Sequence, residues 1–217
     1  MTQLRRPAEQ AKCRLYIISP SEIDIGTFPS LLDEALSAGD VACFQLRLKT
    51  ANDDEIIRAC QVLTPVAHAH DVAVLINDRP DLAKYAGADG AHVGQRDMSY
   101  EKARDTLGSN SIIGVTCHDS RHFAMVAAEA GADYVAFGAF FETQTKDAVG
   151  RAELDLLTWW QQMMEIPCVG IGGITVDNAH EVAIAGADFI AVSGGIWSYS
   201  DGPGVAVRAL NAAIRSS

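Results

Sequence analysis

Three long polar side chains alternate at the end of one apolar segment in the first quarter of the chain. In the sequence Gln45-Leu46-Arg47-Leu48-Lys49 they occupy every second position, so they share one face if the segment is a strand. Burying such groups costs free energy unless a ligand or counter-charge meets them. Arg47 and Lys49 could simply mark the solvated end of a strand, but Gln45 lies too far inside for that explanation. We therefore predict that this face binds a ligand.

Two carboxylates follow the next two apolar segments. Asp78 directly precedes a predicted helix, where Asn or Asp is a common cap, and Asp97 taken alone would be an ordinary loop residue. If the two segments are neighbouring strands, however, the carboxylates can converge. Two hard oxygen ligands with room for water and phosphate suit Mg²⁺. Together with the cations of the preceding segment, they predict a Mg²⁺–diphosphate site.

The residues after the later apolar segments offer hydroxyl groups, a lysine and paired glycines. They are Thr116, Thr143, Thr145, Lys146, Gly172, Gly173 and Ser193. The segment with Thr143, Thr145 and Lys146 fits a phosphate clamp and a solvated loop equally well. Glycines followed by a helix start let backbone N–H groups approach an anion.

Two histidines in these segments have simpler explanations. His92 is more often a satisfied core histidine than a ligand, and we keep it as a weak candidate. Cys117 beside His118 suggests a nucleophile pair, but adjacent strand residues point apart.

The candidates divide into two anion sites. The first carries metal and uses Arg47, Lys49, Asp78, Asp97 and Lys146. The second carries no metal and uses Gly172, Gly173 and Ser193. Two such sites facing each other indicate two phosphorylated substrates, one of them with a diphosphate leaving group.

A recurring joint organises the chain that must position these residues. An Ala-rich helical pattern, an Ala-Gly turn and an apolar run recur at Ala38–Asp40, Ala86–Asp89, Ala130–Asp133 and Ala185–Asp188. Short, nearly continuous apolar runs indicate strands buried on both faces. We predict eight, at Leu15–Ile18, Val41–Leu46, Val72–Ile76, Gly90–Val93, Ile112–Val115, Tyr134–Phe137, Cys168–Ile171 and Phe189–Val192.

This α/β alternation predicts a single (β/α)8 TIM barrel over residues 1–217, with residues 1–12 as a flexible N-terminal extension. An open doubly wound sheet is the alternative, and the absence of a visible break in strand order favours the barrel. Helix starts are expected at Asn52, with Glu55 three residues later, and at Thr175. The active site of such a barrel lies in the loops that follow the strands.

Composition narrows the partners and the compartment. The formal net charge of −11 argues against nucleic acid and anionic membranes, but not against a small phosphate ligand in a focused basic pocket. No apolar run approaches the roughly 18 residues of a membrane span, and residues 1–12 lack the apolar core of a secretory signal. The five cysteines are scattered without a C-x-x-C pair. We expect a cytoplasmic protein with reduced thiols, and the sequence leaves its oligomeric state open.

Several of these segments together resemble the thiamine phosphate synthase family. They are Gln45–Lys49, Asn77–Arg79, His92–Asp97, Gly114–His118, Thr143–Lys146 and Ile171–Ile174, in the family's order and spacing. The resemblance implies condensation of 4-amino-2-methyl-5-(diphosphooxymethyl)pyrimidine with 4-methyl-5-(2-phosphooxyethyl)thiazole to give thiamine phosphate and diphosphate. In the family, diphosphate leaves first and the thiazole nitrogen attacks the resulting pyrimidine-stabilised cation, so no protein nucleophile is required.

The resemblance also implies roles for individual residues. Gln45, Arg47, Lys49 and Asn77 would bind the pyrimidine diphosphate, with Thr116 on its pyrimidine side, Lys146 on its diphosphate, and Asp78 and Asp97 on Mg²⁺. Thr143, Thr145, Gly173, Val192 and Ser193 would bind the thiazole phosphate. Catalysis would rest on Arg47, Lys49, Lys146 and Thr116.

The sequence departs from the family pattern at Thr116, where Ser is usual, at Ala139, where Pro is usual, and in the more glycine-rich Ser193–Gly195. Two alternatives remain. One is a thiazole tautomerase-like paralogue, which lacks the paired aspartates and the complete T-x-T-K. The other is a catalytically inactive ligand-binding barrel.

Overall fold

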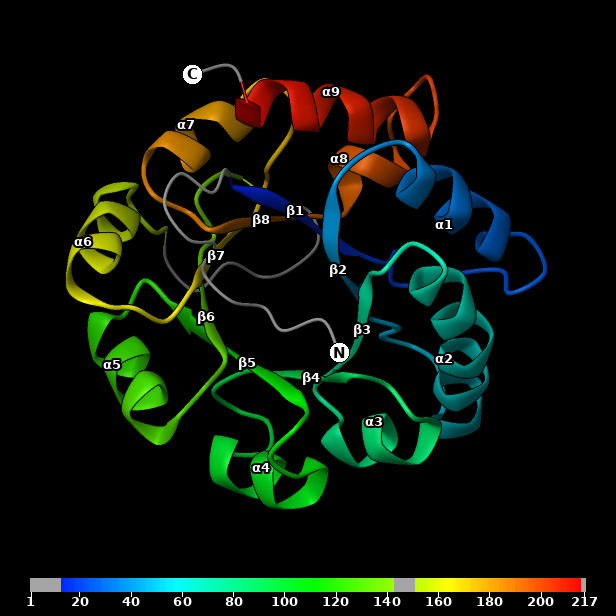
Figure 1. Ribbon diagram of the computed structural model, residues 1–217, viewed down its shortest axis with the longest axis horizontal. Coiled ribbons are helices and arrows are strands. Elements are labelled where there is room, and N and C mark those ends of the chain that lie inside the picture. Colours follow the sequence, from blue (N-terminus) through cyan, green and yellow to red (C-terminus); the bar gives the residue numbers. More distant parts are fainter. Residues whose placement is uncertain (1–12, 143–150, 216–217) are drawn as a thin grey trace.

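Eight parallel strands close into a barrel in the order in which they occur along the chain (Figure 1). The structure is a computed structural model and describes residues 13–142 and 151–215. The strands are β1 (Arg14–Ile18), β2 (Val41–Leu46), β3 (Ala73–Asn77), β4 (Gly90–Val93), β5 (Ile112–His118), β6 (Tyr134–Phe137), β7 (Cys168–Ile171) and β8 (Phe189–Val192). Because β1 pairs with β8 as well as β2, the barrel is confirmed and the open sheet is excluded.

A ring of helices surrounds the strands (Figure 1). The helices are α1 (Phe28–Ser37), α2 (Asp53–His68), α3 (Pro80–Ala86), α4 (Tyr100–Leu107), α5 (Arg121–Ala130), α6 (Asp155–Met163), α7 (Ala179–Ile184), α8 (Gly194–Trp197) and α9 (Pro203–Arg215). The short α8 follows β8 directly, and α9 packs between α1 and α7.

One of the two expected helix starts is confirmed and the other is wrong. Asn52 accepts a hydrogen bond from the Glu55 N–H at 3.0 Å, and the Glu55 carboxylate accepts one from the Asn52 N–H at 2.8 Å, which forms a capping box for α2. The second start lies at Ala179, not at Thr175. The Asn178 carboxamide accepts a hydrogen bond from the Thr175 N–H at 2.8 Å, so the intervening residues form a turn before α7.

The apolar residues form two layers. Strand side chains that point outward pack with the helices, as Phe44 and Leu46 of β2 do. A second apolar cluster fills the interior of the barrel, and it consists of Tyr16, Ile18, Ala42, Cys43, Ala73, Leu75, Ile112, Tyr134, Ala136, Val169, Phe189 and Ala191. Both faces of the strands are therefore buried, which explains their nearly continuous apolar sequences.

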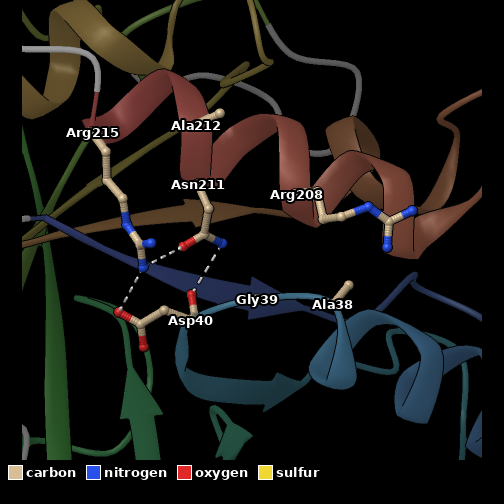
Figure 2. Close-up of a pocket in the computed structure, with 7 residues that line it drawn as sticks. All are labelled: Ala38, Gly39, Asp40, Arg208, Asn211, Ala212 and Arg215. Atoms are coloured by element: carbon tan, nitrogen blue, oxygen red, sulfur yellow. Dashed lines mark hydrogen bonds and ion pairs between the residues drawn. The ribbon is translucent and has the colours of Figure 1, made fainter.

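A small hollow of about 250 Å³ lies at the N-terminal ends of the strands, between the residues that precede β2 and the helix α9 (Figure 2). The Asn211 carboxamide donates a hydrogen bond to the Asp40 carbonyl at 3.3 Å, and Arg215 lies 4.0 Å from the Asp40 carboxylate. Arg14 pairs with the same carboxylate at 2.7 Å. This end of a barrel contributes to stability, and these contacts fasten the last helix to the first strands.

All five cysteines lie in the described part of the chain. Cys13, Cys43, Cys60, Cys117 and Cys168 are all free, and all but Cys13 are buried. Within residues 13–142 and 151–215, no helix is long and apolar enough to cross a membrane. The predicted flexible extension, residues 1–12, lies outside the described residues.

Candidate active site

A cavity of about 460 Å³ opens at the C-terminal ends of the strands. All eight strands or the loops that follow them contribute to its wall, as expected for the functional end of a barrel. Of the residues given a role from the sequence, the structure brings eight together in this wall: Gln45, Arg47, Asn77, Thr116, Gly172, Gly173, Val192 and Ser193. The weak candidate His92 lies in the same wall.

The other selected residues lie elsewhere. Lys49, Asp78 and Asp97 belong to the loops that continue from β2, β3 and β4, but they are exposed and do not line the cavity. Thr143, Thr145 and Lys146 lie outside the described residues.

Gln45 is a deeply buried polar residue of the wall, with 3% of its surface exposed. Its backbone carbonyl accepts a hydrogen bond from the Ser19 N–H, but its carboxamide makes no hydrogen bond to another residue within the described part of the chain. Buried amide groups are almost always hydrogen-bonded in folded proteins. The carboxamide is therefore available to a ligand in the cavity.

Arg47 continues the same face of β2 into the cavity. Its backbone N–H donates to the Ser19 hydroxyl at 2.8 Å, which joins the ends of β1 and β2. Partial burial lowers the pKa of the Arg47 guanidinium from its usual value, and the charge of Asp78 partly opposes this shift. An arginine stays protonated despite such a shift, so the cavity holds a half-buried cation that an anionic ligand would stabilise.

Asp78 does not cap the following helix. The N-cap position of α3 is Arg79, and no side-chain hydrogen bond caps that helix. Arg79 instead pairs with Asp53 and Asp81 on the outer surface. The backbone N–H of Asp78 donates to the His92 carbonyl at 2.7 Å and its φ is +63°, so the end of β3 is fastened to β4.

Asp97 is oriented by the loop that carries it. Its Oδ2 accepts a hydrogen bond from the Gly94 N–H at 2.8 Å. Among the described residues, no group of three or more His, Cys, Asp or Glu side chains could hold a metal ion. Asp78 and Asp97 are two hard oxygen donors on neighbouring loops, and Mg²⁺ commonly binds to one or two carboxylates plus waters and substrate phosphate. The pair fits a Mg²⁺ ion shared with a phosphorylated ligand and does not fit a self-sufficient metal cage.

On the opposite wall, two glycines form a tight loop after β7. Gly172 and Gly173 have φ values of +101° and +67°. A β-carbon on Gly172 would collide with Ala139, and one on Gly173 would lie 2.7 Å from the Phe141 side chain. Asn178 donates a hydrogen bond to the Gly173 carbonyl at 3.0 Å. The loop therefore presents backbone rather than side chains to the cavity.

The hydroxyl of Ser193 is hydrogen-bonded within the protein. Its hydroxyl donates a hydrogen bond to the Ser19 carbonyl at 3.1 Å, so its proton is directed away from the cavity. Ser193 is also the N-cap residue of α8, whose first N–H groups lack intrahelical acceptors. This segment would approach a ligand through backbone N–H groups rather than through the serine hydroxyl.

A chain of hydrogen bonds runs from the barrel interior to the cavity wall. The Tyr16 and Tyr134 hydroxyls lie 2.9 Å apart, Tyr134 Oη lies 2.8 Å from His92 Nδ1, and His92 Nε2 lies 2.7 Å from Thr116 Oγ1. His92 is 8% exposed, and both tyrosines are almost fully buried. Burial raises the pKa of both phenols, so both stay protonated.

The cavity also contains residues that sequence reasoning missed. Ser19 and Ser21 line it directly after β1, and Glu142 lines it after β6. His118, considered from the sequence only as half of a nucleophile pair, lines it at the end of β5. The two serines follow the first predicted strand directly in the sequence, and that position is the signal that identifies them. Cys117 lies in the outer apolar layer, where burial raises the pKa of its thiol to about 12, so the nucleophile pair with His118 is excluded.

The matching family model and the most similar sequence relatives agree on one family. Residues 15–196 match the family model described as thiamine monophosphate synthase. The chain is 58% identical over 203 residues to a thiamine-phosphate synthase of Rhodospirillum centenum, covering 94% of this chain and 98% of that protein. It is 50% identical to one of Hyphomonas neptunium, covering 100% and 99%. The solved thiamine phosphate pyrophosphorylase of Pyrococcus furiosus superposes with a TM-score of 0.80 at 31% identity, covering 93% of this chain and 95% of that one.

Proposed function

The chain belongs to the thiamine monophosphate synthase family and is a transferase of thiamine biosynthesis, and on that basis we propose the two substrates and the course of its reaction. We propose that it joins 4-amino-2-methyl-5-(diphosphooxymethyl)pyrimidine to 4-methyl-5-(2-phosphooxyethyl)thiazole, releasing diphosphate. The substrates are small molecules that both carry phosphate, in agreement with the two polar walls of one cavity.

The observation that carries the proposal is the Gln45 carboxamide, which is buried in the cavity wall without a hydrogen-bond partner among the described residues. A site built to hydrogen-bond a heteroaromatic ring provides such a group, because ring nitrogens and amino groups pair with both ends of an amide. Arg47 lies two residues further along the same strand face, where a diphosphate attached to that ring would reach.

Departure of diphosphate would be promoted by the cations around it. Arg47 in the wall, Lys49 beyond it and Lys146 from the loop after β6 would stabilise the negative charge that develops on the leaving oxygen. A Mg²⁺ ion held by Asp78 and Asp97 would supply Lewis-acid neutralisation of the same diphosphate. The cavity then confines the pyrimidine cation beside the thiazole nitrogen, so positioning rather than a protein nucleophile accounts for the bond that forms.

The thiazole phosphate would occupy the opposite wall. The loop of Gly172 and Gly173 and the N-terminus of α8 after Val192 and Ser193 offer backbone N–H groups there. Thr143 and Thr145, which lie outside the described residues, would contribute hydroxyl groups to this half. The two phosphates would then lie at separate ends of the cavity and the reacting rings between them.

The purified protein, given both substrates, tests the proposal. We expect thiamine phosphate and diphosphate to form in equal amounts, and the reaction to depend on added Mg²⁺. Conversion of the thiazole tautomer without any condensation would favour the tautomerase-like alternative. Binding of the substrates without turnover would favour the inactive ligand-binding barrel.

The proposed setting is the cytoplasm. All five cysteines are free thiols, which suits a reducing compartment. The net charge of −11 gives no electrostatic reason for nucleic acid or an anionic membrane as a partner.

A further inference from the structure

The hydrogen-bond chain Tyr16–Tyr134–His92–Thr116 depends on a residue without a side chain in the strand between Tyr134 and His92. In the barrel register His92 of β4 pairs with Gly114 of β5, and Gly114 pairs with Tyr134 of β6. Because Gly114 has no side chain, the Tyr134 ring lies over it and its hydroxyl reaches His92 on the far side. A β-carbon at Gly114 would collide with that ring. The contact between Tyr134 and His92 thus depends on a glycine in the strand between them.

The direction of these hydrogen bonds follows from the donor and acceptor strengths of the groups. A phenol is a good donor and a poor acceptor, whereas an unprotonated imidazole nitrogen is a good acceptor. The favourable arrangement has Tyr16 donating to Tyr134 and Tyr134 donating to Nδ1 of His92. The imidazole proton is then on Nε2 and is donated to Thr116 Oγ1. A doubly protonated imidazole would also donate to Thr116, so both states leave the threonine hydroxyl as the acceptor.

The hydroxyl proton of Thr116 then has no acceptor among the described residues. Within the described part of the chain, the Thr116 hydroxyl has no hydrogen-bond partner other than His92. Thr116 lines the cavity, so its O–H group is left to donate toward a ligand. Without the chain, the hydroxyl could instead donate to an unprotonated Nε2 and would offer the ligand only lone pairs.

From this geometry we infer that Tyr16, Tyr134 and His92 are positioning residues that fix the Thr116 hydroxyl as a hydrogen-bond donor to the pyrimidine substrate. The substrate atom that it meets is an acceptor without a hydrogen, a ring nitrogen of the aminopyrimidine rather than its amino group. The inference rests on the proposed substrates, and it assigns a function to two buried tyrosines that touch no ligand themselves.

A double-mutant cycle tests the inference. Thr116→Val removes the donor while keeping the shape of the side chain, and Tyr134→Phe removes the central hydroxyl of the chain. We expect each to lower kcat/KM for the pyrimidine diphosphate by about tenfold, with KM for the thiazole phosphate unchanged. Because Tyr134 acts through Thr116, the double variant should also lose about tenfold rather than about a hundredfold. Additive losses would mean that Tyr134 has only a structural role and would overturn the inference.

Two further variants complete the cycle. Thr116→Ser restores a hydroxyl and should recover most of the activity lost in Thr116→Val. Tyr85→Phe removes a phenol that is 75% exposed and should show no coupling to Thr116→Val. If circular dichroism finds Tyr134→Phe unfolded, the cycle is repeated with His92→Phe, which removes the imidazole that donates to Thr116, and the same non-additivity is expected.

Calorimetric binding separates this inference from the proposed reaction. Thr116→Val should weaken binding of the pyrimidine diphosphate and leave binding of inorganic diphosphate unchanged. If binding of inorganic diphosphate weakens equally, the acceptor is a phosphate oxygen and the ring-nitrogen assignment is wrong. A wild-type protein that binds the pyrimidine diphosphate but forms no thiamine phosphate would overturn the proposed function alone, and the binding cycle would still decide the inference.

Discussion

The ring of Tyr134 occupies the space that a β-carbon on Gly114 would need. The two residues are paired across β5 and β6, and Tyr134 is completely buried. A glycine is therefore needed at position 114 because the Tyr134 ring leaves no room for a side chain, and not because of the backbone conformation of Gly114. It allows a large polar side chain to cross one strand and bond to the next.

Gly114→Ala should consequently destabilise the protein and displace Tyr134. Adding a methyl group to a filled core costs about 2 kcal/mol, and urea unfolding should detect that loss. The same added carbon at the exposed Gly26 meets only the Asp24 side chain, at 3.3 Å, so Gly26→Ala is the matched control and should change stability little. An unaltered unfolding midpoint for Gly114→Ala would contradict the placement of Tyr134.

Gln45→Leu should affect activity and stability in opposite directions. The carboxamide makes no hydrogen bond among the described residues and faces the cavity, so replacing it with an apolar group of similar size breaks no hydrogen bond within the described part of the chain. We expect unchanged or higher stability in urea, together with a loss of about tenfold or more in kcat/KM for the pyrimidine substrate. Gln61→Leu, on the exposed surface of α2, is the control and should leave the kinetics unaltered. A marked fall in stability of Gln45→Leu would show that the amide has a structural partner.

The strands were predictable because burial on both faces leaves a local signature. The prediction agrees with the structure at both ends of β2, β4, β6, β7 and β8, and it stops three residues early in β5. Two of the three extra residues of β5, Thr116 and His118, are polar, partly exposed and line the cavity, so the apolar pattern ended before the strand did. The barrel fold also predicts that the loops after the strands form the active site, which explains why eight residues given a role from the sequence meet in one wall.

The hydrogen-bonded interior was not predictable in the same way. From the sequence alone His92 is only a weak candidate, and both tyrosines are ordinary strand residues. Their contacts depend on which residues of neighbouring parallel strands lie side by side, as His92, Gly114 and Tyr134 do. The sequence of each strand says little about that register, because the strands are paired through crossover helices rather than tight turns. The expected helix start at Thr175 was wrong because of another contact that the local pattern does not show. The hydrogen bond from the Asn178 carboxamide to the Gly173 carbonyl holds a turn there.

Arg79→Gln should lower stability at neutral pH and lose that effect in acid. Hydrogen bonds from Arg79 depress the pKa of the carboxyls of Asp53 in α2 and Asp81 in α3. These hydrogen bonds join the two helices. A carboxyl group whose pKa is depressed in the folded state stabilises the protein at every pH above its unfolded-state pKa, which is near 3.8. That stabilisation is lost as the pH falls through the folded-state pKa.

The difference in Tm between wild type and Arg79→Gln should therefore be constant at neutral pH and shrink from about pH 4 downward. It should be small throughout, because the pairs are exposed. Arg58→Gln, on the exposed side of α2, controls for the loss of one positive charge. A deficit that persists undiminished into strong acid would mean that Arg79 stabilises by packing rather than by its carboxylate partners.

Asp97→Asn tests the metal site without disturbing the loop that holds it. The Oδ2 of Asp97 accepts a hydrogen bond from the Gly94 N–H at 2.8 Å, and an asparagine carbonyl oxygen can accept the same bond. The substitution therefore removes the negative charge and one hard ligand while the loop keeps its conformation. Thermal unfolding should be nearly unchanged.

The Mg²⁺ concentration that gives half-maximal activity should rise about tenfold or more in Asp97→Asn, because Mg²⁺ binds to few protein ligands and each carboxylate contributes much of the affinity. Excess EDTA should abolish wild-type activity, and added Mg²⁺ should restore it. Asp105→Asn, on the exposed surface of α4, removes the same charge away from the cavity and should leave the Mg²⁺ dependence unaltered. An identical Mg²⁺ titration for wild type and Asp97→Asn would remove Asp97 from the metal site, and the ion would then have to be held by Asp78 and the diphosphate alone.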